Sequence, residues 1–236
     1  MTPDLSARRL EPEWMDDPDV APRAHRLALA GLARINRASG VARTIWNSIE
    51  QVIRDHPGRR VRILDLACGS GDLTVALARL AARRGISIEL DAADVSPTAL
   101  HETSRRAADA GFDVRPHRLS ALRDPLPDGC DVIVCALFLH HLTAADATML
   151  LRRMADAARR LVVVNDLERS IGGYLVARVG TRLLSRSPIV HNDGPASVAA
   201  AFTLDETRAL AAEAGLVDAD VRRVWPFRLQ LVWRRQ

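Results

Sequence analysis

Two adjacent histidines and one acidic side chain are the residues of this chain best suited to move a proton. His140 and His141 end an apolar segment that begins near residue 131, and Asp166 follows a second apolar segment. A neutral histidine accepts a proton near pH 7, so either ring could activate an oxygen, nitrogen or carbon nucleophile. Either ring could also pack without touching a ligand, and Asp166 could bind substrate, orient a histidine or cap the next segment. The three residues are therefore the catalytic candidates.

Two further polar residues are candidates for substrate binding. Asn165 directly precedes Asp166, and we expect both side chains to point into one crevice. His191 lies in the polar segment 187–195, which reads as a loop that could close over the site. A solvated loop histidine is the plain alternative for His191.

A glycine-rich turn follows a short apolar run at residues 64–74, LDLACGSGDLT. Small residues let backbone amides approach a ligand, and a helix start offers unpaired N–H groups. A P-loop would need Gly-Lys-Ser/Thr, which this turn lacks. A dinucleotide site would need a third glycine where Thr74 stands, and we expect the threonine side chain to obstruct the packing of helix on strand. The turn therefore favours a ligand without a pyrophosphate.

Two acids indicate what that ligand is. Asp65 precedes the turn, where its charge would repel a pyrophosphate but attract an ammonium group. Asp94 ends the next apolar run, where it could accept hydrogen bonds from two ribose hydroxyls. S-adenosylmethionine has a ribose, an adenine and a cationic amino-acid tail, and no phosphate. We therefore expect it as the cofactor.

The elements that position these residues alternate in type along the chain. Apolar strand patterns at 61–66, 86–93, 114–119, 131–136 and 161–164 are separated by helix patterns, the second of which begins at Ser96-Pro97. A helical stretch at 174–184, a capping box at Thr203 and two alternating strands at 217–223 and 227–233 follow. This order predicts an α/β fold with an open, mostly parallel sheet and helices on both faces. Ligands bind such sheets at the carboxyl ends of the strands.

The amino-terminal part of the chain lacks the alternation of strands and helices. Residues 1–15 look like a loose arm, and two amphipathic helices fill the segment from Pro22 to residue 57. We predict an arm and helical cap at 1–57, a main domain at 58–236, and a substrate-lid insertion at about 168–202.

Three of these motifs together resemble class I S-adenosylmethionine-dependent methyltransferases. Residues 64–71 resemble the first motif of that family, 94–100 (DVSPTAL) its second, and 131–142 (DVIVCALFLHHL) the fourth-strand motif of its small-molecule enzymes. The resemblance covers roughly residues 58–236, and the amino-terminal helices and the insertion resemble the lids of ubiquinone-methylase-like and natural-product O-methyltransferases. It implies a Rossmann-like seven-stranded sheet with a terminal antiparallel strand pair and an N-terminal helical cap.

The resemblance also implies which residues hold the cofactor. The turn would hold the methionine part, Asp94 the ribose, and Val95 the adenine ring. The acid that the family usually places beside the adenine amino group is replaced by Ser120 and Ala121, and Ala67 replaces the first loop glycine. The expected cofactor-binding residues are Asp65, Ala67, Cys68, Gly69, Gly71, Asp94, Val95, Ser120, Ala121 and Ala136.

Composition excludes several classes of function. The chain has 236 residues, 33 basic and 29 acidic side chains, and 48% hydrophobic residues, which is ordinary for a globular protein. Every basic side chain is an arginine, and the arginines are scattered among acids, which favours a solvated surface over a nucleic-acid stripe. The amino terminus has no signal core, and no apolar run approaches membrane-spanning length. We expect a cytoplasmic protein with no membrane or nucleic-acid partner, and leave a homodimer open.

A metal is not expected. Cys68, Cys130 and Cys135 form no C-x-x-C pair, and we interpret Cys68 and Cys135 as buried core residues. Catechol-type O-methyltransferases resemble this fold but have an acid after the fourth strand, where this chain has Cys135-Ala136, and Asp-Asn after the fifth, where it has Asn165-Asp166.

The sequence thus predicts methyl transfer to a small molecule. The favoured reaction is O-methylation of a phenol, hydroquinone or polyketide-like aromatic, with a histidine as general base. C-methylation of a quinol-type ring is the alternative. The rival class is an RNA methyltransferase, although the (Asp/Asn)-Pro-Pro-aromatic turn and the Pro-Cys dipeptide of nucleic-acid enzymes are absent.

Overall fold

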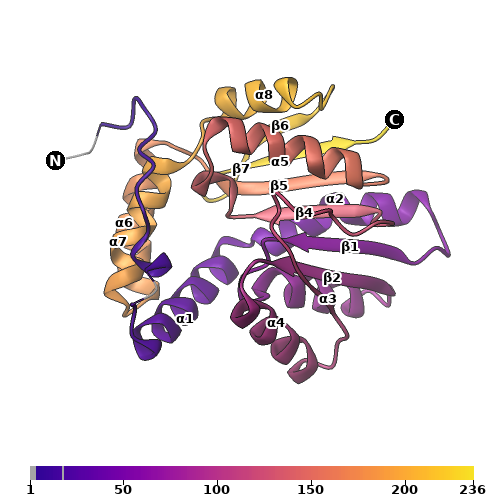
Figure 1. The fold of residues 1–236 in the computed structure, drawn as a ribbon, viewed down its shortest axis with the longest axis horizontal. Coiled ribbons are helices and arrows are strands. Elements are labelled where there is room, and N and C mark those ends of the chain that lie inside the picture. The colour runs from indigo at the N-terminus through magenta and orange to yellow at the C-terminus, as the bar shows by residue number, and fades with distance from the viewer. Residues whose placement is uncertain (1–3, 18) are drawn as a thin grey trace.

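A single mixed sheet forms the centre of the molecule (Figure 1). The computed structural model describes residues 4–17 and 19–236, and within them seven strands pair in the order β3-β2-β1-β4-β5-β7-β6. Neighbours among the first five strands are parallel, and β7 is antiparallel to both β5 and β6. The strands are β1 (Val61–Leu66), β2 (Ile88–Asp94), β3 (Arg115–Arg118), β4 (Val132–Ala136), β5 (Leu161–Leu167), β6 (Asp220–Val224) and β7 (Arg228–Arg234). The predicted fold class is confirmed.

Helices cover both faces of this sheet. The core on one face packs β1, β4 and β5 against α2 and α3, and the core on the other face packs them against α5 and α8. The helices are α1 (Pro22–Ser39), α2 (Val41–Asp55), α3 (Asp72–Arg83), α4 (Pro97–Asp109), α5 (Ala144–Ala157), α6 (Ile171–Leu184), α7 (Pro188–Ala200) and α8 (Leu204–Glu213), with short 3-10 turns η1 (Trp14–Asp16) and η2 (Leu139–His141). No helix in the described part of the chain has the length and apolarity needed to span a membrane.

Local sequence signals set the helix starts. The Ser96 hydroxyl accepts a hydrogen bond from the amide of Ala99 at the start of α4. Thr143 caps α5 in the same way. At α8, Thr203 and Glu206 form the predicted capping box.

The segment 187–195 was expected to be a loop, and this expectation is wrong. It forms most of α7, with Pro188 in the first turn and Pro195 inside the helix. Ile189 and Val190 are buried against α1, so tertiary packing stabilises a helix that its Asn, Asp, Gly and Pro residues disfavour locally.

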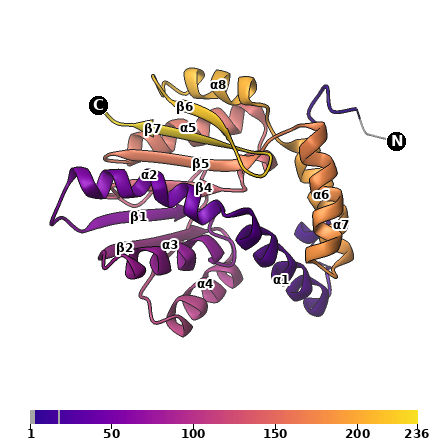
Figure 2. The same cartoon turned by 180° about the vertical axis from the view of Figure 1, so that it is seen from behind.

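A helical cap lies beyond the carboxyl ends of the parallel strands (Figures 1 and 2). It consists of α1, α6, α7 and the amino-terminal segment, whereas α2 packs on the sheet. The expectation of a loose arm is wrong for residues 4–15, while residues 1–3 lie outside the described part. The amide of Arg9 donates to the Ala199 carbonyl at 3.1 Å, and the Asp193 carboxylate accepts the amides of Trp14 and Met15 at 3.0 Å. The predicted domain boundaries stay a prediction.

Candidate functional site

The glycine turn between β1 and α3 has a backbone that ordinary side chains disfavour. Ala67, Gly69 and Gly71 have φ angles of 58°, 52° and 75°. A Cβ on Gly71 would lie 2.7 Å from the side chain of Thr103 in α4, whereas a Cβ on Gly69 would meet nothing within 4 Å. Gly71 is therefore fixed by its neighbour, and Gly69 borders open space where a ligand can approach the backbone.

Asp94, at the end of β2, is held by two backbone amides. Its carboxylate accepts hydrogen bonds from Gly69 at 3.0 Å and from Ser96 at 2.9 Å. These contacts join the glycine turn to the start of α4. A carboxylate has about four acceptor positions, so two remain for a ligand.

Asp65, at the end of β1, is buried and accepts a hydrogen bond of 2.5 Å from the Thr74 hydroxyl. Burial raises the pKa of Asp65 to about 7, although the Thr74 hydrogen bond opposes this effect. Thr74 lies in the first turn of α3, and its expected obstruction of the close packing that a dinucleotide site requires stays a prediction. Its side chain is wholly buried between α3 and β1, because its hydroxyl finds a partner there.

The remaining cofactor candidates lie around the same turn. Val95 directly follows Asp94 and is 60% exposed. The amide of Ser120 donates to the Asp124 carboxylate at 2.7 Å. The loop after β3 therefore contains an acid, four residues beyond Ser120. Buried Ala121 belongs to this loop, and half-buried Ala136 ends the adjacent strand β4.

Burial determines the properties of the cysteines. Cys68 and Cys135 are buried and free, as interpreted from the sequence, and burial raises the pKa of both thiols. Cys68 contacts Thr103 at 3.7 Å, so its side chain packs towards α4 while its backbone forms the turn.

His140 and Asp166 are brought together across the ends of β4 and β5. Nδ1 of His140 lies 2.6 Å from the Asp166 carboxylate, whose other oxygen accepts the His140 amide at 3.2 Å. Both side chains are buried. This contact fixes the ring, and Nε2 points away from Asp166 towards the cap.

Glu13 meets His140 from the other side and was missed in the sequence. Its carboxylate lies 3.7 Å from Nε2 of His140 and accepts a hydrogen bond from the Ser197 hydroxyl. The backbone contacts of residues 9, 14 and 15 with α7 hold Glu13 in place. No local sequence motif predicts such contacts.

Charge determines the protonation of His140. Burial by itself would lower its pKa, but the carboxylates of Asp166 and Glu13 outweigh burial and raise the pKa to about 9. The same interactions lower the pKa of both carboxyl groups. At pH 7 the ring is thus an imidazolium between two carboxylates.

His141 is stacked beside this pair and is partly exposed. Its ring centroid lies 4.2 Å from that of His140 and 6.2 Å from that of Phe138. One ligand atom each from Glu13, His140 and His141 lie within 4.8 Å of one another, which is close enough for a metal. The ion pair of His140 with Glu13 and the ring contact between the two histidines account for this grouping without an ion.

Asn165 and Asp166 do not point into the same crevice, contrary to expectation. β5 extends to Leu167, three residues further than predicted, so both residues lie inside a strand and alternate between its faces. Asp166 faces His140. Asn165 faces the α2 side and is wholly buried.

His191 also lies elsewhere than expected. It belongs to α7, and its Nε2 lies 2.8 Å from the Ser185 carbonyl at the end of α6. The ring therefore contacts the connection between the two cap helices, and its assignment to substrate stays a prediction.

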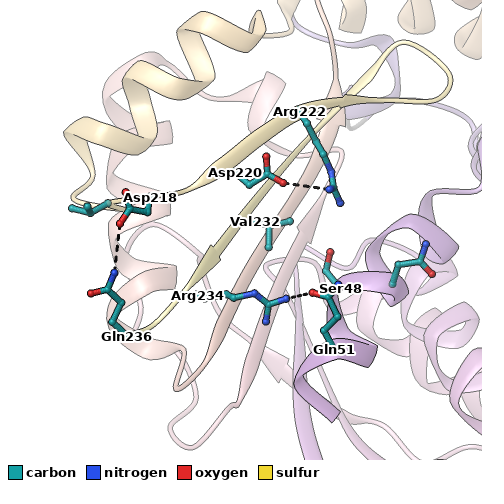
Figure 3. A pocket seen from close by; sticks show the side chains of 10 residues that line it. Ser48, Gln51, Asp218, Asp220, Arg222, Val232, Arg234 and Gln236 are labelled. Atoms are coloured by element: carbon teal, nitrogen blue, oxygen red, sulfur yellow. Dashed lines mark hydrogen bonds and ion pairs between the residues drawn. The ribbon is translucent and has the colours of Figure 1, made fainter. Parts of the chain in front are cut away.

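A hollow of about 370 Å³ lies far from these groups, between α2 and the β6–β7 pair (Figure 3). Arg234, which lines it, pairs with Leu161 at the start of β5, so the hollow is at the opposite end of the sheet. Its charged groups have partners: Arg222 pairs with Asp220 at 3.3 Å, Arg234 donates to Gln51, and Asp218 accepts from Gln236.

Comparison with known proteins gives a match to the part of the chain that contains the glycine turn. Residues 63–160 match a family model described as a methyltransferase domain. A ribosomal protein L11 methyltransferase of Ralstonia pickettii is 31% identical over 171 residues, 72% of this chain and 52% of that protein. A ubiquinone biosynthesis O-methyltransferase of Methylococcus capsulatus is 32% identical over 129 residues, 53% of this chain and 51% of that protein. The chain spans about half the length of these relatives.

Solved structures share the fold. The plantazolicin methyltransferase BpumL in complex with SAH has a TM-score of 0.67 at 14% identity, covering 94% of this chain and 93% of that one. The magnesium protoporphyrin IX methyltransferase of Synechocystis PCC 6803 with bound SAH has a TM-score of 0.57 at 15% identity, covering 84% of both chains. At these identities the likeness concerns the fold.

Proposed function

We infer that this protein, a class I S-adenosylmethionine-dependent methyltransferase of the small-molecule branch, methylates an oxygen of a small aromatic molecule. Its methyltransferase domain covers residues 63–160. The observation that carries this proposal is the buried Asp166–His140 pair, which lies at the same edge of the sheet as the glycine turn. The finer assignments below, including the acceptor and the base, belong to the same proposal.

The residues around the turn fit S-adenosylmethionine. Gly69 leaves open space beside the backbone, Asp94 retains acceptor positions for ribose hydroxyls, and exposed Val95 offers an apolar surface to the adenine. Asp65 provides a carboxylate for the ammonium group, and the amide of Ser120 is fixed by Asp124 nearby. When bound, the cofactor supplies a methyl group that its sulfonium makes electrophilic.

His140 is the proposed general base. Asp166 orients the ring through Nδ1, which leaves Nε2 to accept a proton from the acceptor, as in other base–orienter pairs. A phenol has a pKa of about 10, close to that of His140, so proton transfer between them is nearly balanced. An acceptor hydroxyl that takes the place of Glu13 at Nε2 would also remove one of the charges that keep His140 protonated.

The remainder of the catalytic contribution is alignment. Holding nucleophile, methyl and sulfur in line removes the entropic part of the barrier. The cap helices and residues 4–15 cover the carboxyl ends of the strands and would exclude water from the acceptor. The similarity to an enzyme named for ubiquinone biosynthesis supports a hydroquinone or phenol as acceptor.

The test is methyl transfer from labelled S-adenosylmethionine, in EDTA, to a panel of phenols and hydroquinones, with bulk RNA and ribosomal protein alongside. The expected result is label on a phenolic oxygen, located by mass spectrometry, at a rate that EDTA leaves unchanged. Label on a ring carbon would show that the reaction is C-methylation and not the proposed O-methylation. Label only on RNA or protein would overturn the substrate class, and dependence on a divalent ion would overturn the metal-free site.

A further inference from the structure

A second group of buried polar side chains lies across β5 and β7, on the face of the sheet that α2 covers. In the antiparallel register Asn165 is opposite Gln230, and Leu167 is opposite Arg228. Side chains at alternate positions share a face, so Asn165, Arg228 and Gln230 lie on one side of the sheet at its carboxyl edge. Asp166 and His140 lie on the other side of the same edge.

Arg228 is a buried charge without an adequate partner. It is 3% exposed, and its Nη1 has no hydrogen-bond acceptor among the described residues. Its Nη2 reaches only the side-chain oxygen of Asn36 in α1, at 3.4 Å, which is long for a hydrogen bond. Asp166 is the acid whose charge acts on Arg228, but the Asp166 carboxylate already binds His140 and the amide of Leu167. A guanidinium in this position therefore lacks the anion that would compensate its burial.

Asn165 is also unsatisfied. It is wholly buried, and neither its amide nitrogen nor its oxygen has a partner within the described part of the chain. Gln230 beside it differs, because its amide nitrogen reaches the Thr44 carbonyl at 3.3 Å. On the adjacent strand Asn165 pairs with Ala136, whose methyl group offers no hydrogen bond. Two buried donors, the Arg228 Nη1 and the Asn165 amide, thus lack an acceptor at one edge of the sheet.

We propose that Arg228 and Asn165 bind a carboxylate of the methyl acceptor, so that the acceptor is an aromatic hydroxy acid. Arginine binds carboxylates with two parallel hydrogen bonds, and an asparagine amide can add a third. Asp166 and His140 lie on one face at this edge of the sheet, Arg228 lies on the other face, and the charge of Asp166 acts on Arg228 across the edge. This arrangement suits a ring whose hydroxyl meets His140 while its carboxylate meets Arg228. The inference rests on the proposed function, since it names the acceptor of that reaction.

The cofactor also has a carboxylate, but the strand order separates it from Arg228. Asp65, which is assigned to the ammonium group, is in β1, and β4 and β5 lie between it and β7. Strands are spaced by about 4.8 Å, so β7 lies roughly 14 Å from β1. The ammonium and carboxylate groups of the cofactor are bonded to one carbon, so they stay together near β1.

Binding measurements test this assignment without turnover. The full chain, saturated with SAH (S-adenosylhomocysteine), is titrated calorimetrically with 4-hydroxybenzoate and with 4-hydroxybenzamide, which has the same shape but no charge. Wild type is compared with Arg228→Met, and with Arg234→Met as the matched control, because Arg234 lies on the same strand and face but is bonded to Gln51 at the surface. We expect wild type and Arg234→Met to bind the acid at least tenfold more tightly than the amide. Arg228→Met should lose that preference while keeping its affinity for SAH.

The outcomes separate this inference from the proposed function. Equal binding of acid and amide by wild type, or binding of neither, would overturn the carboxylate site, and this comparison requires no variant to fold. A preference for the acid that survives in Arg228→Met would also overturn it, as would loss of SAH affinity in that variant. If wild type prefers the acid over the amide but transfers no methyl group to any phenol, the proposed reaction is refuted while the carboxylate site is supported.

Discussion

The Glu13 carboxylate lies 3.7 Å from Nε2 of His140, so the amino-terminal segment covers the ring nitrogen that Asp166 leaves available. Two acids from distant parts of the chain, Glu13 and Asp166, thereby set the charge of one histidine. Because the contact is electrostatic, its removal should be visible in the pH dependence of the enzyme.

Replacing Glu13 should shift the pH profile towards lower pH. Glu13→Gln removes one of the two charges that raise the pKa of His140, so His140 loses its proton earlier. The rising limb of kcat/KM should move down by about half a pH unit or more. Glu11→Gln, on the same segment but exposed, is the control and should leave the profile in place. An unmoved limb in Glu13→Gln would show that Glu13 does not act on the base.

The wild-type profile should rise with pH and level off above about 9. His140 accepts a proton only when it is neutral, and its pKa in the folded protein is about 9. His140→Ala should lower kcat by about 100-fold or more while sparing affinity for SAH, and His101→Ala on exposed α4 should do neither. If His140→Ala abolishes SAH binding instead, the histidine has a structural role.

Asp94 should control cofactor affinity. Asp94→Ala removes the acceptors proposed for the ribose hydroxyls and also releases the amides of Gly69 and Ser96, so binding of SAH should weaken by about 1–3 kcal/mol. Asp109→Ala, which removes an exposed acid of α4 paired with Arg105, should bind SAH as wild type does. Calorimetric titration measures both, and undiminished affinity in Asp94→Ala would refute the ribose assignment.

Asp65→Asn should stabilise the unliganded protein at high pH and weaken cofactor binding. The folded pKa of Asp65 is about 7, above its usual value of 3.8, so its contribution to stability is present at low pH and is lost as pH rises through 7. The asparagine variant avoids this loss, and its free energy of unfolding should exceed that of wild type by about 4 kcal/mol at pH 8. Urea unfolding at pH 4.5 and pH 8 checks this, because the difference should be about 3 kcal/mol smaller at pH 4.5. A difference independent of pH would contradict the buried carboxyl as its cause.

The two glycines of the turn should respond unequally to alanine. Gly69→Ala strains only the backbone, by about 1–2 kcal/mol, since its Cβ would enter open space. Gly71→Ala adds a contact of 2.7 Å with Thr103, so its loss of thermal stability should be clearly larger. For cofactor binding the order should reverse, because the Cβ of residue 69 points into the space assigned to the ligand. Equal effects on melting temperature would show that Thr103 moves aside.

Local signals in the sequence determined most of the fold and half of the site. The apolar runs that became β1, β4 and β5, the caps at Ser96 and Thr203, and the turn with Asp65 and Asp94 all lie within a few residues of the feature they specify. Parallel strands place their carboxyl ends at one edge, so the order of the elements along the chain is enough to predict the histidines beside the turn.

Tertiary structure alone decided the rest, because the deciding contacts are distant in sequence and carry no local pattern. The helix at 188–200 exists because its apolar residues are buried against α1, and Glu13 reaches His140 because backbone contacts hold its segment on α7. Because β5 extends to Leu167, Asn165 and Asp166 lie on opposite faces, which separates the carboxylate that binds His140 from an unsatisfied amide on the side of Arg228. Composition and spacing specify which groups are available for chemistry, whereas strand register and burial decide which of them meet and with what charge.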